Sequence, residues 1–295
     1  MNVTLRPVTP DDLAAVAAVS LAQDLGWWGE AHGDADDAAD DVARAIPDGT
    51  RVAEVDGALV GVGLLFPHGQ ASVMADPAHP SADACRATLL DWVIDAGAAD
   101  LDTPRQDTAL LGLLGARGFT PTRSSFELER DAGLADLPRG DPPAGYEFTE
   151  FQPGRDEHDV HDSIYAVWTD VPGHTHRPFD EWSELIIGGS RFDPRLVTIA
   201  RNAGAGAIAG VSIGRVFDDV GWVMQIAVGH DHRRVGLGRA LLIEALHRLV
   251  SVADLRRVGL SVEAANATAL GLYRSVGLEL TAEWIHCAPA DTAAD

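Results

Sequence analysis

One order of predicted secondary structure occurs twice along this chain of 295 residues. Val60-Gly61 and Gly118-Phe119 in the first half correspond to Ala209-Gly210 and Gly277-Leu278 in the second half. The offsets between these pairs are 149 and 159 residues, so the second copy is longer in its central part. A repeat of this length predicts two domains of ordinary size built on one frame.

Each copy is expected to form an α+β fold of three layers, a mixed and mainly antiparallel sheet flanked by helices. The clearest local signal is a hairpin in which Asp56-Gly57 joins two apolar runs, and a second hairpin is expected over 196–217. Strands are further expected over 3–8, 71–75, 125–129, 146–151 and 279–287, with helices from residue 13 and over 82–96, 156–169 and 178–187. The domains are predicted over 1–135 and 146–295, with a proline-containing linker over 136–145.

Acidic residues outnumber Lys and Arg by 45 to 22, which leaves a formal net charge of −23, and all 22 bases are arginines. A surface of this sign repels nucleic acid and anionic membranes, so neither is an expected partner. The acids are scattered along the chain. This distribution favours the acidic proteome of a halophile, where salt screens the repulsion, over attraction of a polycationic substrate.

Cys85 and Cys287 are too few for a disulfide framework or a metal cluster, and we expect two buried thiols and no metal site. No apolar run approaches the roughly 18 residues that a membrane span needs, and the N-terminus does not have the pattern of a signal peptide. We therefore expect a cytoplasmic protein.

The stretch from Gly221 to Leu278 carries the strongest chemical signal. The apolar run Trp222–Val228 precedes a basic turn with two glycines, Arg233-Arg234-Val235-Gly236-Leu237-Gly238, which opens a helical pattern. Backbone N–H groups at a helix N-terminus bind phosphate, and glycine lets a ligand approach the backbone closely. Arg239 adds positive charge. A turn that only needs flexible residues is the alternative for the glycines.

A second strand-like run, Val258–Val262, is followed by Asn266 and, seven residues later, by Tyr273. This spacing places the two side chains on one face of a helix. Taken alone, Asn266 could be a helix N-cap, and Tyr273 could be a core tyrosine.

Together these residues resemble the GCN5-related N-acetyltransferase (GNAT) family. The likeness rests on Arg233–Gly238 as the Arg/Gln-x-x-Gly-x-Gly/Ala motif for acetyl-CoA, and on Asn266–Tyr273 with Gly277 beyond it. Element order extends it over the second half. The resemblance implies two tandem GNAT-like domains and an enzyme that transfers the acetyl group of acetyl-CoA to a small-molecule primary amine, with its active site in the C-terminal domain.

The resemblance also implies how the co-substrate acetyl-CoA is held. The strand matching Met224–Val228 splays from the strand matching Leu260–Glu263, and the pantetheine arm enters between them. Backbone groups of the first strand would hold this arm, and the glycine turn would hold the pyrophosphate. The implied cofactor-binding residues are Ile226, Ala227, Val228, Arg233, Arg234, Val235, Gly236, Leu237, Gly238, Arg239, Asn266 and Tyr273.

The implied mechanism is direct attack of the amine on the thioester. A backbone N–H at Ile226 or Val228 would stabilise the oxyanion. Tyr273 would give its proton to the departing CoA thiolate, because a phenol is protonated at neutral pH.

The general base is the open position of this mechanism. Many relatives carry a glutamate on the splayed strand, where Trp222 and Met224 stand here. Glu263 acting through water is the candidate catalytic base, and an amine that arrives deprotonated is the alternative. The loop residues Asp170, His174 and His176 are predicted to line the substrate pocket.

The first half lacks the residues of this motif. Leu114 stands in the place of Tyr273, Asp107 stands in the place of Asn266, and the segment 76–87 contains no glycine. We predict that this half has lost acetyl-CoA binding and supports the second half by packing, or shapes its acceptor pocket.

The tandem arrangement is similar to that of the mycothiol synthases, a branch of the family that pairs a degenerate first copy with an active second copy. Gly154–Glu157 and Arg191–Pro194 add to this likeness. Acetylation of an amine that also carries a thiol is therefore an alternative activity. A non-catalytic acyl-CoA-binding module is the other alternative.

Overall fold

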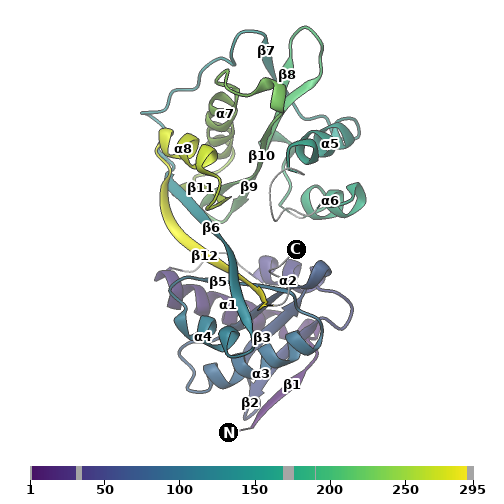
Figure 1. Cartoon of the computed structure of the whole chain (residues 1–295), viewed down its shortest axis with the longest axis vertical. Helices are drawn as coiled ribbons and strands as arrows, with labels where there is room; N and C mark the ends of the chain where they lie inside the picture. The colour runs from purple at the N-terminus through teal and green to yellow at the C-terminus, as the bar shows by residue number, and fades with distance from the viewer. Residues whose placement is uncertain (1, 31–34, 169–175, 190, 291–295) are drawn as a thin grey trace. The chain divides into compact units, whose positions relative to one another are not determined.

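The computed structural model describes residues 2–30, 35–168, 176–189 and 191–290 (Figure 1). The chain divides into two compact units. Unit 1 is made of residues 1–126, 263–265 and 282–295, and unit 2 is made of residues 127–262 and 266–281. No helix among the described residues has the length and apolar character needed to cross a membrane.

The two units differ from the predicted domains at their ends. The predicted linker over 136–145 lies within unit 2, and the end of the chain from Ala282 belongs to unit 1. Strand β6 (Phe119–Asp131) begins in unit 1 and ends in unit 2, whereas β12 (Glu279–Pro289) begins in unit 2 and ends in unit 1. Each unit is therefore completed by a strand end that the other half of the sequence encodes.

Unit 1 follows the predicted order of elements. Its strands are β1 (Val3–Arg6), β2 (Thr50–Val55), β3 (Ala58–Leu65), β4 (Gln70–Ala75) and β5 (Asp100–Pro104), and its helices are α1 (Leu13–Trp28), α2 (Ala35–Arg44), α3 (Ala82–Asp95) and α4 (Thr108–Gly115). The strand order is β1-β2-β3-β4-β5-β12. Only the β4–β5 pair is parallel, and it is joined by the crossover helix α3.

The sheet of unit 1 is covered on both faces. Side chains alternate between the faces along each strand, so that Val52 and Leu64 pack with α1 and α2, whereas Ala53 and Leu65 pack with α3 and α4. Helices α1 and α3 therefore lie on opposite faces of this sheet. In this unit the sheet is mixed and mainly antiparallel, and helices flank both of its faces, as predicted.

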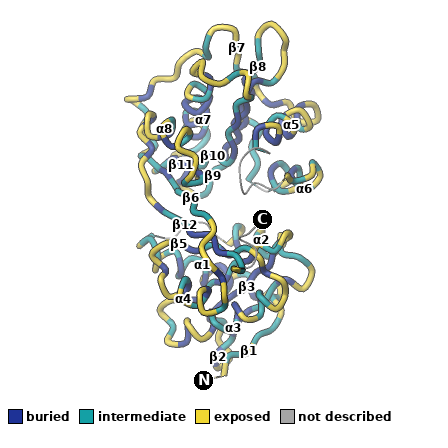
Figure 2. Tube along the Cα trace, in the orientation of Figure 1, coloured by how far each residue is buried: buried dark blue, intermediate teal, exposed yellow. Residues whose placement is uncertain are grey.

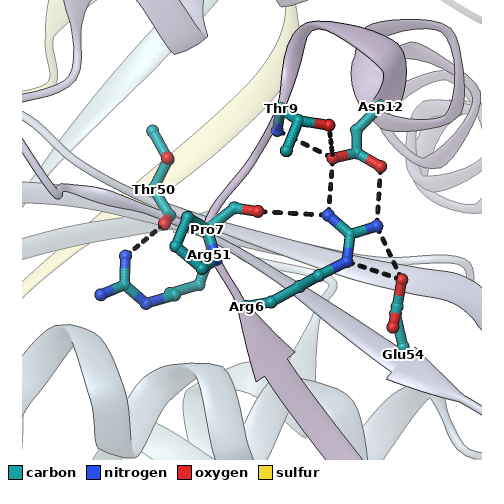
Figure 3. Close-up of polar contacts among 7 residues, drawn as sticks. All are labelled: Arg6, Pro7, Thr9, Asp12, Thr50, Arg51 and Glu54. Atoms are coloured by element: carbon teal, nitrogen blue, oxygen red, sulfur yellow. Dashed lines mark hydrogen bonds and ion pairs between the residues drawn. The ribbon is translucent and has the colours of Figure 1, made fainter.

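A buried carboxylate fixes the start of α1 in unit 1 (Figure 3). Asp12 accepts hydrogen bonds from the backbone N–H and the hydroxyl of Thr9, at 2.8 and 2.7 Å, and pairs with Arg6. Arg6 also donates to Glu54 on β2. The hydrogen bonds from Arg6 hold the pKa of Asp12 well below its ordinary value. In unit 2, Asp156 repeats the device by accepting the N–H of Gln152 at 2.9 Å.

Unit 2 repeats the frame. Its strands are β7 (Tyr146–Glu150), β8 (Val197–Asn202), β9 (Ile208–Phe217), β10 (Val220–Val228) and β11 (Arg257–Glu263), and its helices are α5 (Glu157–Trp168), α6 (Phe179–Ile186), α7 (Leu237–Val252) and α8 (Ala267–Ser275). The strand order is β6-β11-β10-β9-β8-β7. Helices α5 and α6 cover one face of these strands and α7 covers the other, as Figure 1 shows. The dark strands of Figure 2 mark the buried layer between them.

The segment over 136–145 is anchored on α7. Leu137 is buried, and its carbonyl accepts a hydrogen bond from His247 Nε2 at 2.8 Å. Arg139 pairs with Glu244 at 3.0 Å. These contacts hold the segment against the middle of α7.

Candidate functional site

The parallel strands β10 and β11 separate halfway along their length. They pair from Val220 with Arg257 to Val223 with Leu260, and the pairing ends there. At the same point a bulge at Met224 shifts the register of β10 against β9. A bulge bends its strand, so the end of β10 is directed away from β11. This split is the one that the resemblance implied.

Backbone groups of β10 line the split. Gly229 N–H donates to the carbonyl of Ala209 on β9 at 2.9 Å. Because N–H groups alternate in direction along an antiparallel strand, the N–H groups of Val228 and Ile226 point away from β9 and into the split. The Val228 N–H has no acceptor among the described residues, which is rare for a strand interior and leaves a donor for a ligand.

Two residues close to Val228 in the sequence, Ala227 and Arg233, make other contacts. Ala227 has its backbone directed toward β9 and its side chain in the core under α5. Arg233, predicted to contact the cofactor, donates from Nε to the carbonyl of Val228 at 3.1 Å. Arg233 therefore satisfies the carbonyl of Val228, whereas the N–H of Val228 stays without an acceptor among the described residues.

The basic turn has the backbone shape that a phosphate cradle needs. Arg234 has φ of +64° and Gly236 has φ of +87°, both in the left-handed region. A positive φ is uncommon at a bulky residue such as Arg234 and costs conformational energy. Gly236 is the N-cap of α7, and no side chain of the described residues caps this helix. The first N–H groups of α7 are thus open to a ligand.

Gly238 differs from Gly236 because the fold does not require it. A Cβ built on Gly238 would meet Leu272 at 3.6 Å and Val228 at 3.7 Å, which are ordinary contacts. Gly238 therefore leaves space that the protein itself does not fill. Gly236 and Arg239 also border a groove of about 320 Å³, whose other wall is formed by residues of the segment 138–143.

The charge at this turn is unusual for the chain. Arg234 and Arg239 are exposed, and neither has a carboxylate partner among the described residues, although acids outnumber bases by 45 to 22. Val235, which follows Arg234 in the sequence, is an apolar side chain that is 49% exposed. Open arginines beside open N–H groups form a site for an anion.

Helix α8 carries the last two predicted residues. Asn266 is its N-cap and accepts the N–H of Ala269 at 3.1 Å, just as Asp107 caps α4 by accepting the N–H of Leu110. Tyr273 is 6% exposed, and burial raises the pKa of its phenol to about 12. Its hydroxyl has no hydrogen-bond partner among the described residues and is not among their fully enclosed, unpartnered atoms. A protonated donor is therefore free at this place.

The candidate base Glu263 is engaged elsewhere. Its carboxylate accepts a hydrogen bond from Arg123 Nη1 at 2.5 Å, and Arg123 also pairs with Asp100 at 3.2 Å. Glu263 belongs to unit 1, whereas Tyr273 belongs to unit 2.

Two of the predicted substrate residues, Asp170 and His174, lie outside the described residues. The third, His176, is exposed and lies against Tyr165 and His161 of α5, with ring centroids 4.8 and 5.7 Å apart. His161 is itself buried and bonded to the carbonyl of Arg177 at 2.9 Å. His176 is thus the outer member of an aromatic cluster on α5.

Sequence reasoning missed Gln225. It is buried on β10, one residue past the bulge, and its Oε1 accepts a hydrogen bond from Trp182 of α6 at 3.1 Å. Gln225 is the polar residue of an otherwise apolar run, Trp222–Val228, and that interruption was the available signal. Among the described residues no group of three or more His, Cys, Asp or Glu side chains is placed to hold a metal.

Comparison with known proteins agrees with this geometry. Residues 158–278 match the model of the acetyltransferase (GNAT) family. The mycothiol acetyltransferase of Clavibacter michiganensis subsp. michiganensis is 32% identical over 218 residues, which cover 70% of this chain and 67% of that protein. The chain belongs to the GNAT acetyltransferase family. The mycothiol acetyltransferase of Kineococcus radiotolerans is 29% identical over 241 residues, 77% of each chain.

Solved structures show the same fold over the whole length. A GCN5-related N-acetyltransferase from Sphaerobacter thermophilus has a TM-score of 0.75 at 22% identity and covers 97% of this chain and 94% of its own. A tandem GNAT protein from the clavulanic acid biosynthesis pathway has a TM-score of 0.73 at 17% identity, with coverage of 97% and 98%. The predicted fold, family and N-acetyltransferase class are confirmed. Acetyl-CoA, the predicted co-substrate, is the acetyl donor of this family.

Proposed function

We propose that this chain transfers the acetyl group of acetyl-CoA to the primary amine of a small molecule, at a site in unit 2. Three features of the described residues carry the proposal: the N–H of Val228 in the split has no acceptor, the start of α7 has no side-chain cap, and Arg234 and Arg239 have no carboxylate partner. These groups match the two polar parts of CoA, an amide-bearing arm and a pyrophosphate.

Different residues bind the pantetheine arm and the pyrophosphate of acetyl-CoA. The backbone of Ile226 and Val228 pairs with the pantetheine amides, in the manner of an added strand. The N–H groups of residues 236–239 hold the pyrophosphate, and Arg234 and Arg239 supply charge. Gly238 leaves the backbone accessible where a side chain would stand.

The chemistry needs a donor for each negative charge that develops. Acetyl-CoA supplies a thioester carbonyl, which the amine nitrogen attacks. Of the two N–H groups in the split, at Ile226 and Val228, one stabilises the oxyanion and the other is left for a pantetheine carbonyl. As the carbon–sulfur bond breaks, Tyr273 gives its phenolic proton to the sulfur, and its raised pKa keeps that proton in place beforehand.

The amine must lose a proton to complete the transfer. Glu263 was the predicted base, but its carboxylate is bonded to Arg123. We therefore favour an amine that binds in its neutral form, or one that releases its proton to solvent through water. Gln225 supplies a polar amide on the α5 side of β10, where the acceptor is expected to lie.

A thiol-bearing amine is the more specific candidate acceptor. Several relatives are named mycothiol acetyltransferases, among them the proteins from Kineococcus and Clavibacter. The identity to them, 29% and 32%, supports the reaction class more strongly than the acceptor. A non-catalytic acyl-CoA-binding module has less support, since binding alone needs no buried proton donor at Tyr273.

A thiol-release assay with acetyl-CoA and a panel of amines tests the proposal. The panel should contain matched pairs, an amine with a neighbouring thiol and the same amine with a hydroxyl. We expect turnover with at least one amine. Acetyl-CoA binding without turnover on any member would refute catalysis and leave the binding module, and equal rates within each pair would refute selection for a thiol.

A further inference from the structure

Unit 1 contains the counterpart of the split in unit 2. Gly61 pairs with Ala75 on β3 and β4, as Gly210 pairs with Val228 on β9 and β10, and Gly61 matches Gly210 in the repeat. Ala75 therefore stands where Val228 stands. Strands β4 and β5 pair only through Gln70 with Asp100 and Ala71 with Leu101, so they also separate before Ala75.

The backbone of Ala75 has the same direction as that of Val228. Asp76 N–H donates to the carbonyl of Val60 on β3 at 2.9 Å, in the place of the bond from Gly229 to Ala209. The N–H of Ala75 consequently points away from β3 and into the split. One and the same donor thus faces the split in both units.

In unit 1 this donor is satisfied by the protein itself. Ala75 N–H donates to Oε1 of Gln23, a residue of α1 that is 1% exposed, at 3.0 Å. Arg86 of α3 donates from Nη2 to the same oxygen at 3.1 Å. Since α1 and α3 lie on opposite faces of the sheet, the two side chains meet within the split.

Further buried groups hold this contact in place. Arg86 pairs with Asp107 at 3.4 Å, and Trp27 of α1 donates from Nε1 to Asp107 at 3.0 Å. The side chains of Arg86 and Asp107 are 6% and 5% exposed. A hydrogen-bonded chain therefore runs from α1 through the split to α3 and the start of α4.

Unit 2 has no equivalent of Gln23. Gln23 lies eleven residues after Asp12, and Val167 lies eleven residues after the matching Asp156. The neighbours of Val167, Ala166 and Trp168, also carry no amide or carboxylate. Val167 packs in the apolar core under α5 and borders a groove of about 440 Å³ beside β9. Among the described residues, therefore, no side chain of unit 2 accepts the N–H of Val228 as Gln23 accepts that of Ala75.

We propose that Gln23 and Arg86 take the place of the cofactor in unit 1, so that the chain closes its first acyl-CoA site with its own side chains and binds one acyl-CoA, in unit 2. The Gln23 carboxamide is the functional group that a pantetheine arm would present to this strand. We call the contact of Gln23 with Ala75 and Arg86 the plug. The expected binding of one acyl-CoA per chain rests on the proposed function, whereas the plug does not.

Hydrogen exchange of the Ala75 amide tests the plug without any ligand. The amide of Asp76 is the internal reference, because it is bonded to Val60 and shares the same strand end. We expect Gln23→Ala to speed exchange at Ala75 relative to Asp76 by about five- to thirty-fold, the loss of one buried hydrogen bond. An unchanged ratio in a folded Gln23→Ala protein would overturn the proposal.

Two further variants guard against a general loss of stability. Gln23→Glu keeps an acceptor for both Ala75 and Arg86 and removes the Nε2 donor, which has no partner among the described residues. It should keep the wild-type ratio. Leu25→Ala changes an exposed residue of the same helix and should also keep it. Faster relative exchange at Ala75 in Leu25→Ala would count against a specific role of Gln23.

Equilibrium dialysis with acetyl-CoA tests the expected stoichiometry of one acyl-CoA per chain. We expect one equivalent bound per chain of wild type and none in Gly238→Asp, where a carboxylate faces the phosphates of unit 2. Two equivalents in wild type, or one equivalent remaining in Gly238→Asp, would overturn a closed site in unit 1. Because the exchange ratio needs no ligand, failure of the proposed function is distinguished from failure of the plug.

Discussion

Replacing Gly238 by alanine should separate stability from cofactor binding. Gly238 lies in the first turn of α7, and it is not among the residues with positive φ. A Cβ there would meet only Leu272 at 3.6 Å and Val228 at 3.7 Å, so it fits without strain. Alanine in a helix is more favourable than glycine by about 0.5–1 kcal/mol. The variant without ligand should be more stable, with a Tm higher by about 1–4 °C.

The same methyl group should weaken acetyl-CoA binding. It occupies the space through which a phosphate approaches the N–H groups of α7, and we expect an affinity loss of at least about tenfold, or about 1.4 kcal/mol. Calorimetric titration with acetyl-CoA and a thermal scan of the same preparation give both numbers. The combination of higher stability and weaker binding cannot arise from damage to the fold.

Gly236→Ala is the matched control. Its φ of +87° is costly for alanine, by about 1–2 kcal/mol, so this variant should lose stability as well as affinity. Wild-type affinity in Gly238→Ala would refute a close approach of the pyrophosphate at this turn. A lower Tm in Gly238→Ala would refute the claim that the fold leaves this space free.

Three other results are expected. Tyr273→Phe should lower kcat by about 10²- to 10⁴-fold with acetyl-CoA affinity nearly kept, and stopped-flow binding with steady-state rates would show it; a wild-type kcat would remove the phenol from the mechanism. Because burial raises the pKa of Tyr273 to about 12, the donor stays protonated and kcat should not fall on the basic side below about pH 11; a falling limb near pH 10 would contradict this. Because the pKa of Asp12 is lowered in the folded state, its ion pair stabilises the fold above the unfolded pKa of about 4, and this stabilisation is lost as the pH falls below that value. In a plot of the urea midpoint against pH, Asp12→Asn should therefore show a smaller fall at acid pH than wild type. Parallel curves for the two proteins would refute this linkage.

The sequence predicted the frame of both units because that frame depends on local patterns. Apolar alternation, the Asp56-Gly57 turn and the glycines of the basic turn each fix a short segment. The acidic stretch Ala35–Arg44 forms α2. There Asp36 and Asp37 occupy the first turn and Arg44 the last, an arrangement that suits the helix dipole.

Contacts between residues far apart in the sequence could not be predicted from such local patterns. Nothing in the run 125–129 indicates that β6 ends in unit 2, because any strand can pair with any free edge of suitable length. Glu263 was chosen for its closeness to the split in sequence, yet Arg123 binds it from 140 residues away. Gln23 looks like an ordinary polar residue of a helix until Ala75 and Arg86 are seen beside it.

The plug also explains why the first copy would not regain a cofactor through its turn alone. Glycines placed after β4 would restore a phosphate cradle, but Gln23 would still occupy the donor of Ala75. Removing Arg86 would leave Asp107 as a buried charge without its partner, and such losses cost about 3–5 kcal/mol. Removing Asp107 would leave Arg86 unpaired and also uncap α4. A change at Gln23 alone frees the N–H of Ala75, but emptying the split also requires changes at Arg86 and Asp107, and each of these steps lowers the stability of unit 1. The closed copy is held closed by its own buried charge pair, whereas in the open copy Val167 and its neighbours Ala166 and Trp168 carry no amide or carboxylate that could accept the N–H of Val228.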